Sequence, residues 1–154
     1  ILVIDLRDSG GGDLFEALDI AGLFLPAGTF LGTLAGREAK GNEFRAPSGT
    51  KFTMPLALLV GPDTASAAEV LAGTLQQHGR AKLIGQRTYG KCSSQTDTRL
   101  SDGSVLRYTN REALLPDGRS CSNVGLQPEL IVPDKVFGEL SSLMSIVMKT
   151  YFGQ

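Results

Sequence analysis

Ser66 and Lys91 are the two residues of this chain whose types and spacing point most directly to chemistry. Ser66 lies in the run DTASAAE, Lys91 ends the run TYGK, and 91 − 66 = 25 positions separate them. A serine hydroxyl becomes an effective nucleophile at neutral pH only beside a base. A lysine amine is such a base only when burial lowers its pKa. The pair predicts nucleophilic catalysis with a desolvated lysine.

Both residues also have a purely structural interpretation. Ser66 and Glu69 fit an S-x-x-E capping box, in which the serine only satisfies the first amides of a helix. Lys91, and Gln95 four residues beyond it, are types that usually lie in solvent. A helix N-terminus nevertheless offers a positive dipole and free N–H groups where an oxyanion would form. Capping and catalysis are therefore compatible.

A run of three glycines, residues 10–12, separates an expected strand from an expected helix. Such a turn can present N–H groups to a phosphate or to an oxyanion. Phe15 stands where a dinucleotide-binding fingerprint has its third glycine, and no Gly-Lys-Ser/Thr follows. An oxyanion site fits the pattern better than a nucleotide site, and a purely structural turn remains the alternative.

The remaining chemically versatile residues are few. His78 is the single histidine; it lies at the end of an expected helix and is interpreted as structural. Cys92 and Cys121 allow one disulfide, serve equally as small apolar filler, and with one histidine make no convincing metal site. Cys92 is also a conceivable nucleophile, but no histidine stands near it in the sequence.

The first half of the chain alternates strands with helices. In order, the patterns predict a strand over 1–6, a helix capped by Asp13 and ended by Pro26, a weak strand and an exposed loop within 29–45 (the loop around residues 40–43), a strand over 56–60, a helix over 65–78 and a strand over 81–85. Repeated β-α-β passages predict a partly parallel sheet flanked by helices.

The second half has the signature of β-hairpins. It predicts a hairpin of 95–100 with 105–109, a turn at 116–118, a strand over 129–132 and an amphipathic tail over 134–151 with Val136, Leu140, Leu143 and Val147 on one stripe. The fold class is therefore α/β, in one domain.

Bulk composition excludes several classes of function. The chain has 154 residues, 42% of them hydrophobic and 20% charged, with a net charge of −1. These values indicate a globular domain and give no electrostatic case for nucleic acid or an anionic membrane. No apolar run is long enough to cross a bilayer. The chain opens inside a strand without Met, from which we expect a fragment or a processed product.

Several segments, in this order, resemble those of the C-terminal processing peptidases, also called tail-specific proteases. They are DLRDSGGG (5–12), TASAAE (64–69), GQRTYGK (85–91) followed by Gln95, LSDGS (100–104) and GLQPE (125–129). The resemblance implies a core similar to the Clp protease and crotonase fold over residues 1–154. It implies that Ser66 is the acylating nucleophile, Lys91 the general base and Gln95 the residue that orients the lysine. The oxyanion hole would be the N–H groups of Ala67 and Gly12.

The chain departs from the family pattern at three places. Ala68 replaces a serine, Cys92 and Ser94 replace a glycine and an apolar residue, and no PDZ domain precedes the DLR segment. We therefore expect a PDZ domain and N-terminal parts in the full-length protein. The resemblance also implies no metal or organic cofactor, a polypeptide partner with an unstructured C-terminus, and an exported location (periplasm, cell envelope or thylakoid lumen). In an exported protein, Cys92 and Cys121 are candidates for a disulfide that braces the lysine loop.

The leading hypothesis is a serine endopeptidase that cuts polypeptides near their C-termini. Three alternatives stay open. The first is a non-catalytic ligand-binding module of the same fold. The second is a crotonase-like acyl-CoA enzyme, which would be expected to need acid/base carboxylates in its pocket. The third is a peptidase core that is inactive because its missing parts complete the site.

Overall fold

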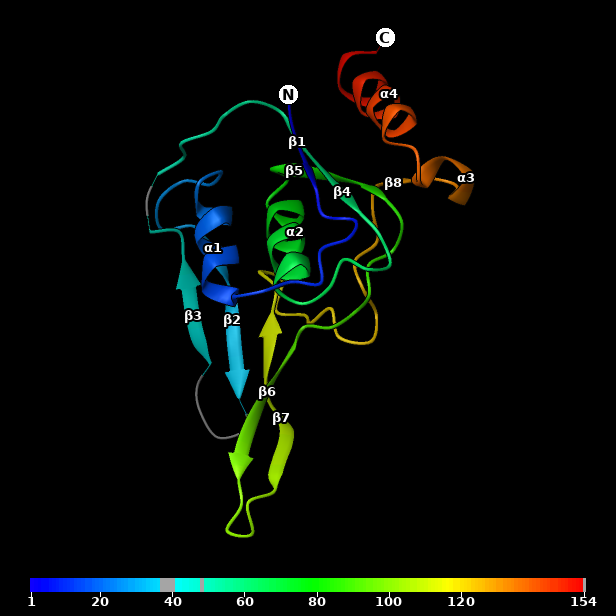
Figure 1. The fold of residues 1–154 in the computed structure, drawn as a ribbon. Helices are drawn as coiled ribbons and strands as arrows, with labels where there is room; N and C mark the ends of the chain where they lie inside the picture. The colour runs from blue at the N-terminus through cyan, green and yellow to red at the C-terminus, as the bar shows by residue number, and fades with distance from the viewer. Residues whose placement is uncertain (37–40, 48, 154) are drawn as a thin grey trace.

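Two four-stranded sheets enclose a pair of helices (Figure 1), in a computed structural model that describes residues 1–36, 41–47 and 49–153. The strands are β1 (Leu2–Asp5), β2 (Phe30–Gly36), β3 (Asn42–Arg45), β4 (Leu56–Val60), β5 (Ala81–Gly85), β6 (Ser93–Arg99), β7 (Val105–Leu114) and β8 (Leu130–Ile131). The helices are α1 (Leu14–Gly22), α2 (Ala67–Gln77), α3 (Asp134–Phe137) and α4 (Leu140–Phe152).

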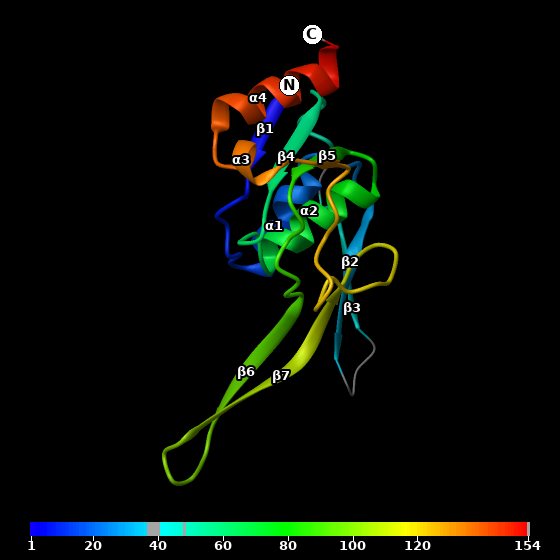
Figure 2. The same ribbon diagram turned by 90° about the vertical axis from the view of Figure 1, so that its right-hand side faces the viewer.

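The first sheet is parallel, in the order β1-β4-β5-β8. Strand β4 consists of five apolar residues, all buried, because both faces of its sheet are covered. Leu56, Leu58 and Val60 belong to the core shared with α1 and α2. Ala57 and Leu59 point to the other face and pack with residues of α4. Helix α4 accordingly lies outside this sheet, whereas α1 and α2 lie inside it (Figure 2).

The second sheet is antiparallel, in the order β3-β2-β7-β6. It covers the other side of α1 and α2, through residues such as Leu31 and Ala113 in the shared core. The hairpin of β6 and β7 extends away from the rest of the molecule (Figure 2). Where this hairpin joins the sheet, its residues reach the start of α2, and this junction holds the candidate site.

The α/β class, the parallel sheet and the second-half hairpin are confirmed. Two local predictions were wrong. Residues 29–45 contribute two paired strands rather than one weak strand and a loop, and residues 42–43 lie in β3; Lys40 falls outside the described residues. The tail forms two helices, since α3 ends at Gly138.

The predicted stripe on the tail is correct only in part. Leu143 and Val147 are fully buried against the parallel sheet, whereas Leu140, at the first position of α4, is exposed. The reason is the break at Gly138, which changes the direction of the chain before α4 begins. Among the described residues, no helix is both long and apolar enough to span a bilayer.

Candidate active site at the start of helix α2

Ser66 is the residue immediately before α2 and has an unusual backbone conformation. Its φ of 58° and ψ of −126° lie outside the regions that residues with a Cβ normally occupy. Such a conformation costs about 1–3 kcal/mol, and it persists only where the surrounding structure imposes it. Strained residues of this kind cluster at functional sites, so the backbone independently marks Ser66.

Hydrogen bonds to the end of β1 fix the turn that leads to Ser66. Thr64 is fully buried; its Oγ1 donates to the carbonyl of Leu6 at 2.7 Å and accepts from the N–H of Gly61 at 2.9 Å. The N–H of Ala65 donates to the carbonyl of Ser9 at 2.9 Å. The segment before the nucleophile is thereby attached to the start of the glycine turn.

The glycine turn approaches Ser66 so closely that Gly11 cannot carry a side chain. Gly11 has a φ of +100°, and a Cβ there would lie 2.7 Å from the Cβ of Ser66 and 2.9 Å from the nitrogen of Ala67. Asp13 then caps α1, because its Oδ1 accepts from the N–H groups of Phe15 and Glu16. The glycine turn thus approaches the start of α2 closely at Gly11, and Gly12 lines the same cavity as Ser66 and Ala67.

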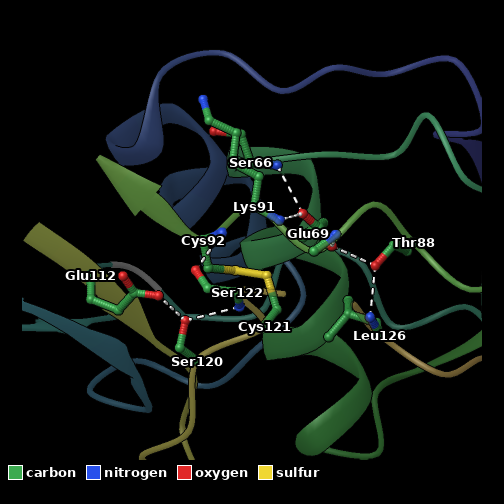
Figure 3. Close-up of a disulfide and its surroundings, with 11 residues drawn as sticks. Ser66, Glu69, Thr88, Lys91, Cys92, Glu112, Ser120, Cys121, Ser122 and Leu126 are labelled. Carbon is green, nitrogen blue, oxygen red and sulfur yellow. Dashed lines mark hydrogen bonds between the residues drawn. A yellow bond between two sulfur atoms is a disulfide. The ribbon is translucent and has the colours of Figure 1, made fainter. Parts of the chain in front are cut away.

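Glu69 links the serine segment to the lysine segment (Figure 3). This carboxylate is fully buried. Its Oε2 accepts from the main-chain N–H of Ser66 (3.1 Å) and of Lys91 (2.7 Å). Its Oε1 accepts from the Thr88 hydroxyl (2.5 Å) and the N–H of Gly90 (2.8 Å). The predicted capping box of Ser66 and Glu69 is therefore present, and the same carboxylate also fixes the loop that carries Lys91.

A disulfide anchors the other side of the lysine segment. Cys92 and Cys121 are bonded, with their Cα atoms 5.4 Å apart, and both are buried. The N–H of Cys92 donates to the hydroxyl oxygen of Ser122 at 3.1 Å. Figure 3 shows the disulfide directly beside the Glu69 network. Lys91 therefore lies between a buried carboxylate contact and a covalent cross-link.

One cavity of about 390 Å³ is lined by all five residues for which the resemblance implies a role in the site. They are Gly12, Ser66, Ala67, Lys91 and Gln95. The fold therefore brings together the turn before α1, the start of α2 and the segment from Lys91 into β6, which are distant in the sequence. His78 does not line this cavity; its Nε2 lies 2.7 Å from the carbonyl oxygen of Phe30.

The side chains of Lys91 and Gln95 differ from expectation in two respects. Lys91 is exposed rather than buried, although it lines the cavity. Gln95 donates to the hydroxyls of Ser93 (3.1 Å) and Thr109 (3.3 Å) rather than contacting the lysine. Within the described part of the chain, no hydrogen bond joins the Lys91 amine to Ser66 or to Gln95.

The potential ligands for a metal ion are already engaged. Oxygen and sulfur atoms of Glu69, Cys92 and Cys121 lie within 4.8 Å of one another. A metal would require the sulfurs as thiolates, whereas here they form the disulfide. The Glu69 oxygens accept four hydrogen bonds. The arrangement is thus suited to organising two chain segments rather than to holding an ion.

Comparison with known proteins decides the family. The profile of Peptidase family S41 matches residues 1–132. The chain belongs to peptidase family S41. It is 36% identical over 142 residues to a carboxyl-terminal-processing protease of Synechocystis, covering 91% of this chain and 33% of the relative. It is 32% identical over 142 residues to a CtpA-like serine protease of Staphylococcus aureus, covering 91% of this chain and 29% of the relative.

The fold of this S41 chain agrees with that of a solved relative. The photosystem II D1 C-terminal processing protease superposes with a TM-score of 0.78 at 32% identity, covering 92% of this chain and 37% of that chain. The S41 chain spans about a third of the length of the curated relatives it matches. The matched part of this chain, 91% of it for the two curated relatives, thus corresponds to one part of those proteins.

Sequence reasoning missed two features of this S41 site. It treated Glu69 only as a helix cap, although a fully buried acid must have partners, and Thr88 had no signal at all. It also gave no indication that Leu34 and Ala113 line the cavity, because they belong to strands whose place beside α2 depends on the tertiary fold.

Proposed function

We propose that this chain is the catalytic core of a serine endopeptidase that cuts polypeptides near their C-termini through a Ser66–Lys91 dyad. The observation that supports it most is that Gly12, Ser66, Ala67 and Lys91 line one cavity, in a chain of family S41. The strained backbone of Ser66 supports the same choice of nucleophile.

The proposed reaction begins when the Ser66 hydroxyl attacks the scissile carbonyl carbon and the neutral Lys91 amine takes its proton. The N–H groups of Ala67 and Gly12 hold the resulting oxyanion, each contributing about 3 kcal/mol. Collapse of the tetrahedral intermediate breaks the C–N bond, and the Lys91 ammonium protonates the departing amine. Water, deprotonated by Lys91, then hydrolyses the acyl-enzyme and releases Ser66.

Because Lys91 is exposed, the proposal requires the bound substrate to shield its amine from water. A lysine amine acts as a base only when it is removed from water. A peptide bound across the cavity would cover Lys91 and remove water from its amine. Gln95 would then have to exchange its contacts with Ser93 and Thr109 for one with Lys91.

The type of substrate, a PDZ domain and the location of the protein are also part of the proposal. The name of the Synechocystis relative describes processing at carboxyl termini, and we propose the same for an unstructured polypeptide tail here. A PDZ domain in the full-length protein would present that tail. The disulfide supports an exported location, because such bonds persist in oxidising compartments.

The second candidate is a non-catalytic binding module, and the exposure of Lys91 is the observation in its favour. A crotonase-like activity has less support. Asp13 is a carboxylate that lines the cavity, but its Oδ1 is occupied in capping α1.

The test is hydrolysis of an unstructured protein with an apolar C-terminus, across about pH 6 to 10, by the full-length protein that contains this chain. Ser66→Ala and Lys91→Ala are assayed beside it, and intact-mass spectrometry follows the acyl-enzyme. The dyad predicts activity that rises with pH and disappears in both variants. Turnover by Ser66→Ala would exclude Ser66 as the nucleophile, and an inactive parent protein that still binds the substrate would favour the binding module.

A further inference from the structure

The hydroxyl of Thr88 is buried between two segments of the chain, and the catalytic proposal makes no use of it. Thr88 lies in the loop after β5, ahead of Lys91, and its side chain is almost fully buried. Its Oγ1 donates to Oε1 of Glu69 at 2.5 Å and accepts from the N–H of Leu126 at 2.7 Å. Figure 3 shows Thr88 between these two partners. The hydroxyl therefore joins the segment around Leu126 to helix α2.

The two bonds determine the direction in which the Thr88 hydroxyl donates. A threonine hydroxyl has one proton to donate and lone pairs with which to accept. The N–H of Leu126 can only donate, so Oγ1 accepts from it. The proton of the hydroxyl is then directed at the Glu69 carboxylate, which can only accept. Thr88 is thus held as a donor to one particular oxygen of Glu69.

The other oxygen of Glu69 holds the two segments that carry the proposed dyad. Oε2 accepts from the main-chain N–H groups of Ser66 and Lys91. The two oxygens of a carboxylate belong to one planar group, so a rotation about its last side-chain bond displaces both. The bonds from Thr88 and Gly90 to Oε1 oppose that rotation. Of these four donors, Thr88 is the one whose donating group belongs to a side chain, so a substitution can remove it.

A tight turn that ends at Leu126 keeps Thr88 in place. The N–H of Thr88 donates to the carbonyl of Leu126 at 3.2 Å. Gly125 has a φ of +71°, and a Cβ there would overlap the carbonyl oxygen of Thr88. The N–H of Asn123 donates to the carbonyl of Gly90 at 2.8 Å. The turn therefore packs against the lysine segment through main-chain contacts, and it supports the Thr88 hydroxyl from the side opposite the carboxylate.

We propose that Thr88 is a positioning residue for the reaction, because its hydroxyl holds the Glu69 carboxylate in the orientation that places Ser66 and Lys91. The inference rests on the proposed peptidase function. Thr88 is not among the residues that line the cavity, so it acts through Glu69 rather than on the substrate. Without the hydroxyl, Oε1 and the N–H of Leu126 would each lose a partner in a buried place. The carboxylate would then be free to turn, and the two N–H groups on Oε2 would lose their fixed acceptor.

The test compares three variants of the full-length protein that contains this chain. Thr88→Val keeps the shape of the side chain but has no hydroxyl, whereas Thr88→Ser keeps the hydroxyl. Thr74→Val is the matched control: Thr74 is also fully buried, and its Oγ1 donates to the carbonyl of Leu31 at 3.0 Å rather than to Glu69. Hydrolysis of an unstructured protein with an apolar C-terminus gives kcat and KM. Circular dichroism gives the melting temperatures, and all assays are run below the lowest of them.

The positioning role predicts a specific loss in kcat. Thr88→Val should lower kcat about tenfold to a hundredfold, because misplaced reacting groups slow the chemical step. KM should change much less, since the residues that line the cavity are unaltered. Thr88→Ser should retain most of the activity. Thr74→Val should lose thermal stability but keep its kcat. The double variant Thr88→Val/Glu69→Gln should have a kcat no lower than that of Glu69→Gln, since both changes act through one carboxylate.

Hydrogen exchange followed by mass spectrometry gives a readout that does not depend on activity. Thr88→Val should speed exchange in the peptides that contain the N–H groups of Ser66 and Lys91, because both lose a fixed acceptor. Thr74→Val should leave exchange in the Lys91 peptide unchanged. If Thr88→Val does not fold, Thr88→Ala takes its place with the same expectations. Failure of both to fold, beside a folded Thr74→Val, would assign the hydroxyl to folding and overturn its role in positioning.

The outcomes separate this inference from the peptidase proposal. Ser66-dependent hydrolysis with an unchanged kcat in folded Thr88→Val would overturn the positioning role alone. An equal fall of kcat in Thr74→Val would also overturn it, since the loss would then follow stability. Absence of Ser66-dependent hydrolysis by the parent protein would remove the peptidase proposal. In either case, unchanged hydrogen exchange in Thr88→Val would show that Thr88 does not place the two segments.

Discussion

Ser66 and Lys91 donate their main-chain N–H groups to the same atom, Oε2 of Glu69, at 3.1 and 2.7 Å. Residues 25 positions apart (91 − 66) in the sequence are thereby placed side by side, although no hydrogen bond joins the side chains of these two described residues. The buried carboxylate is the structural centre of the candidate site, and its partners make it testable.

Replacing Glu69 should disrupt both segments at once. Glu69→Ala leaves four donors without their acceptor, and we expect the free energy of unfolding to fall by about 3 kcal/mol. Glu69→Gln keeps the shape of the side chain but replaces one accepting oxygen with an NH₂ group, which cannot accept a hydrogen bond. We therefore expect kcat to fall while KM changes less. Urea unfolding and steady-state kinetics measure these effects. Wild-type kcat in folded Glu69→Gln would show that the carboxylate does not position the dyad.

Two substitutions at Ser66 distinguish the catalytic role of its hydroxyl from the strain of its backbone. Ser66→Ala should abolish hydrolysis and leave stability nearly unchanged, because Ala retains the Cβ that makes a φ of 58° unfavourable. Ser66→Gly should also be inactive, but more stable than Ser66→Ala by about 1 kcal/mol, since glycine tolerates this conformation. Thermal unfolding of the two variants side by side provides the comparison. Equal melting temperatures would mean that the backbone at Ser66 stores no strain.

Reducing the disulfide should weaken the lysine side of the site. Cys92 and Cys121 are 29 positions apart, and a cross-link of that span contributes about 3 kcal/mol of stability. In dithiothreitol, the melting temperature and kcat/KM should both fall. The double variant Cys92→Ser/Cys121→Ser should be insensitive to the reductant. Full activity after thiol titration has confirmed complete reduction would show that the cross-link does not support Lys91.

The pair of Asp5 and Arg7 should make stability depend on pH in the acid range. Hydrogen bonds from the Arg7 side chain lower the pKa of Asp5 below its ordinary value of 3.8. A carboxyl with a lowered folded-state pKa stabilises the fold above its unfolded-state pKa, and this contribution is lost as the pH falls through the folded-state pKa.

Asp5→Asn should therefore lower the unfolding free energy near pH 7 by up to about 1 kcal/mol, because the carboxyl is largely exposed and screened by solvent. The difference from wild type should diminish as the pH falls below 3.8 and through the lowered folded-state pKa of Asp5. Urea unfolding at several pH values measures both. The exposed Asp19→Asn variant, whose carboxylate is in none of the ion pairs of the described residues, serves as a control for charge alone. A difference that persists unchanged in acid would contradict the role of the ion pair.

Local sequence patterns predicted the helices, strands and turns that are determined by residues close together in the sequence. Asp13 begins α1, β4 is a continuous buried run, and the turn near Gly103 joins β6 to β7. The ordered motifs led to Ser66, Lys91 and Gln95, which line one cavity.

What the sequence did not predict depends on contacts between distant segments. The four hydrogen bonds of Glu69 arise only when the loop after β5 meets α2. The pairing of Leu34 with Ala113 depends on sheet register across most of the chain. The exposure of Lys91 depends on which segments of the fold pack around it, and no local sequence pattern determines that.

The shared oxygen of Glu69 also has a consequence for thermal motion. Because the backbones at Ser66 and Lys91 are attached to one buried atom, a displacement of the start of α2 carries the lysine segment in the same direction. The distance between the two segments then fluctuates less than the position of either within the molecule. Such coupling preserves the relative placement of two reacting groups even when the surrounding domain moves.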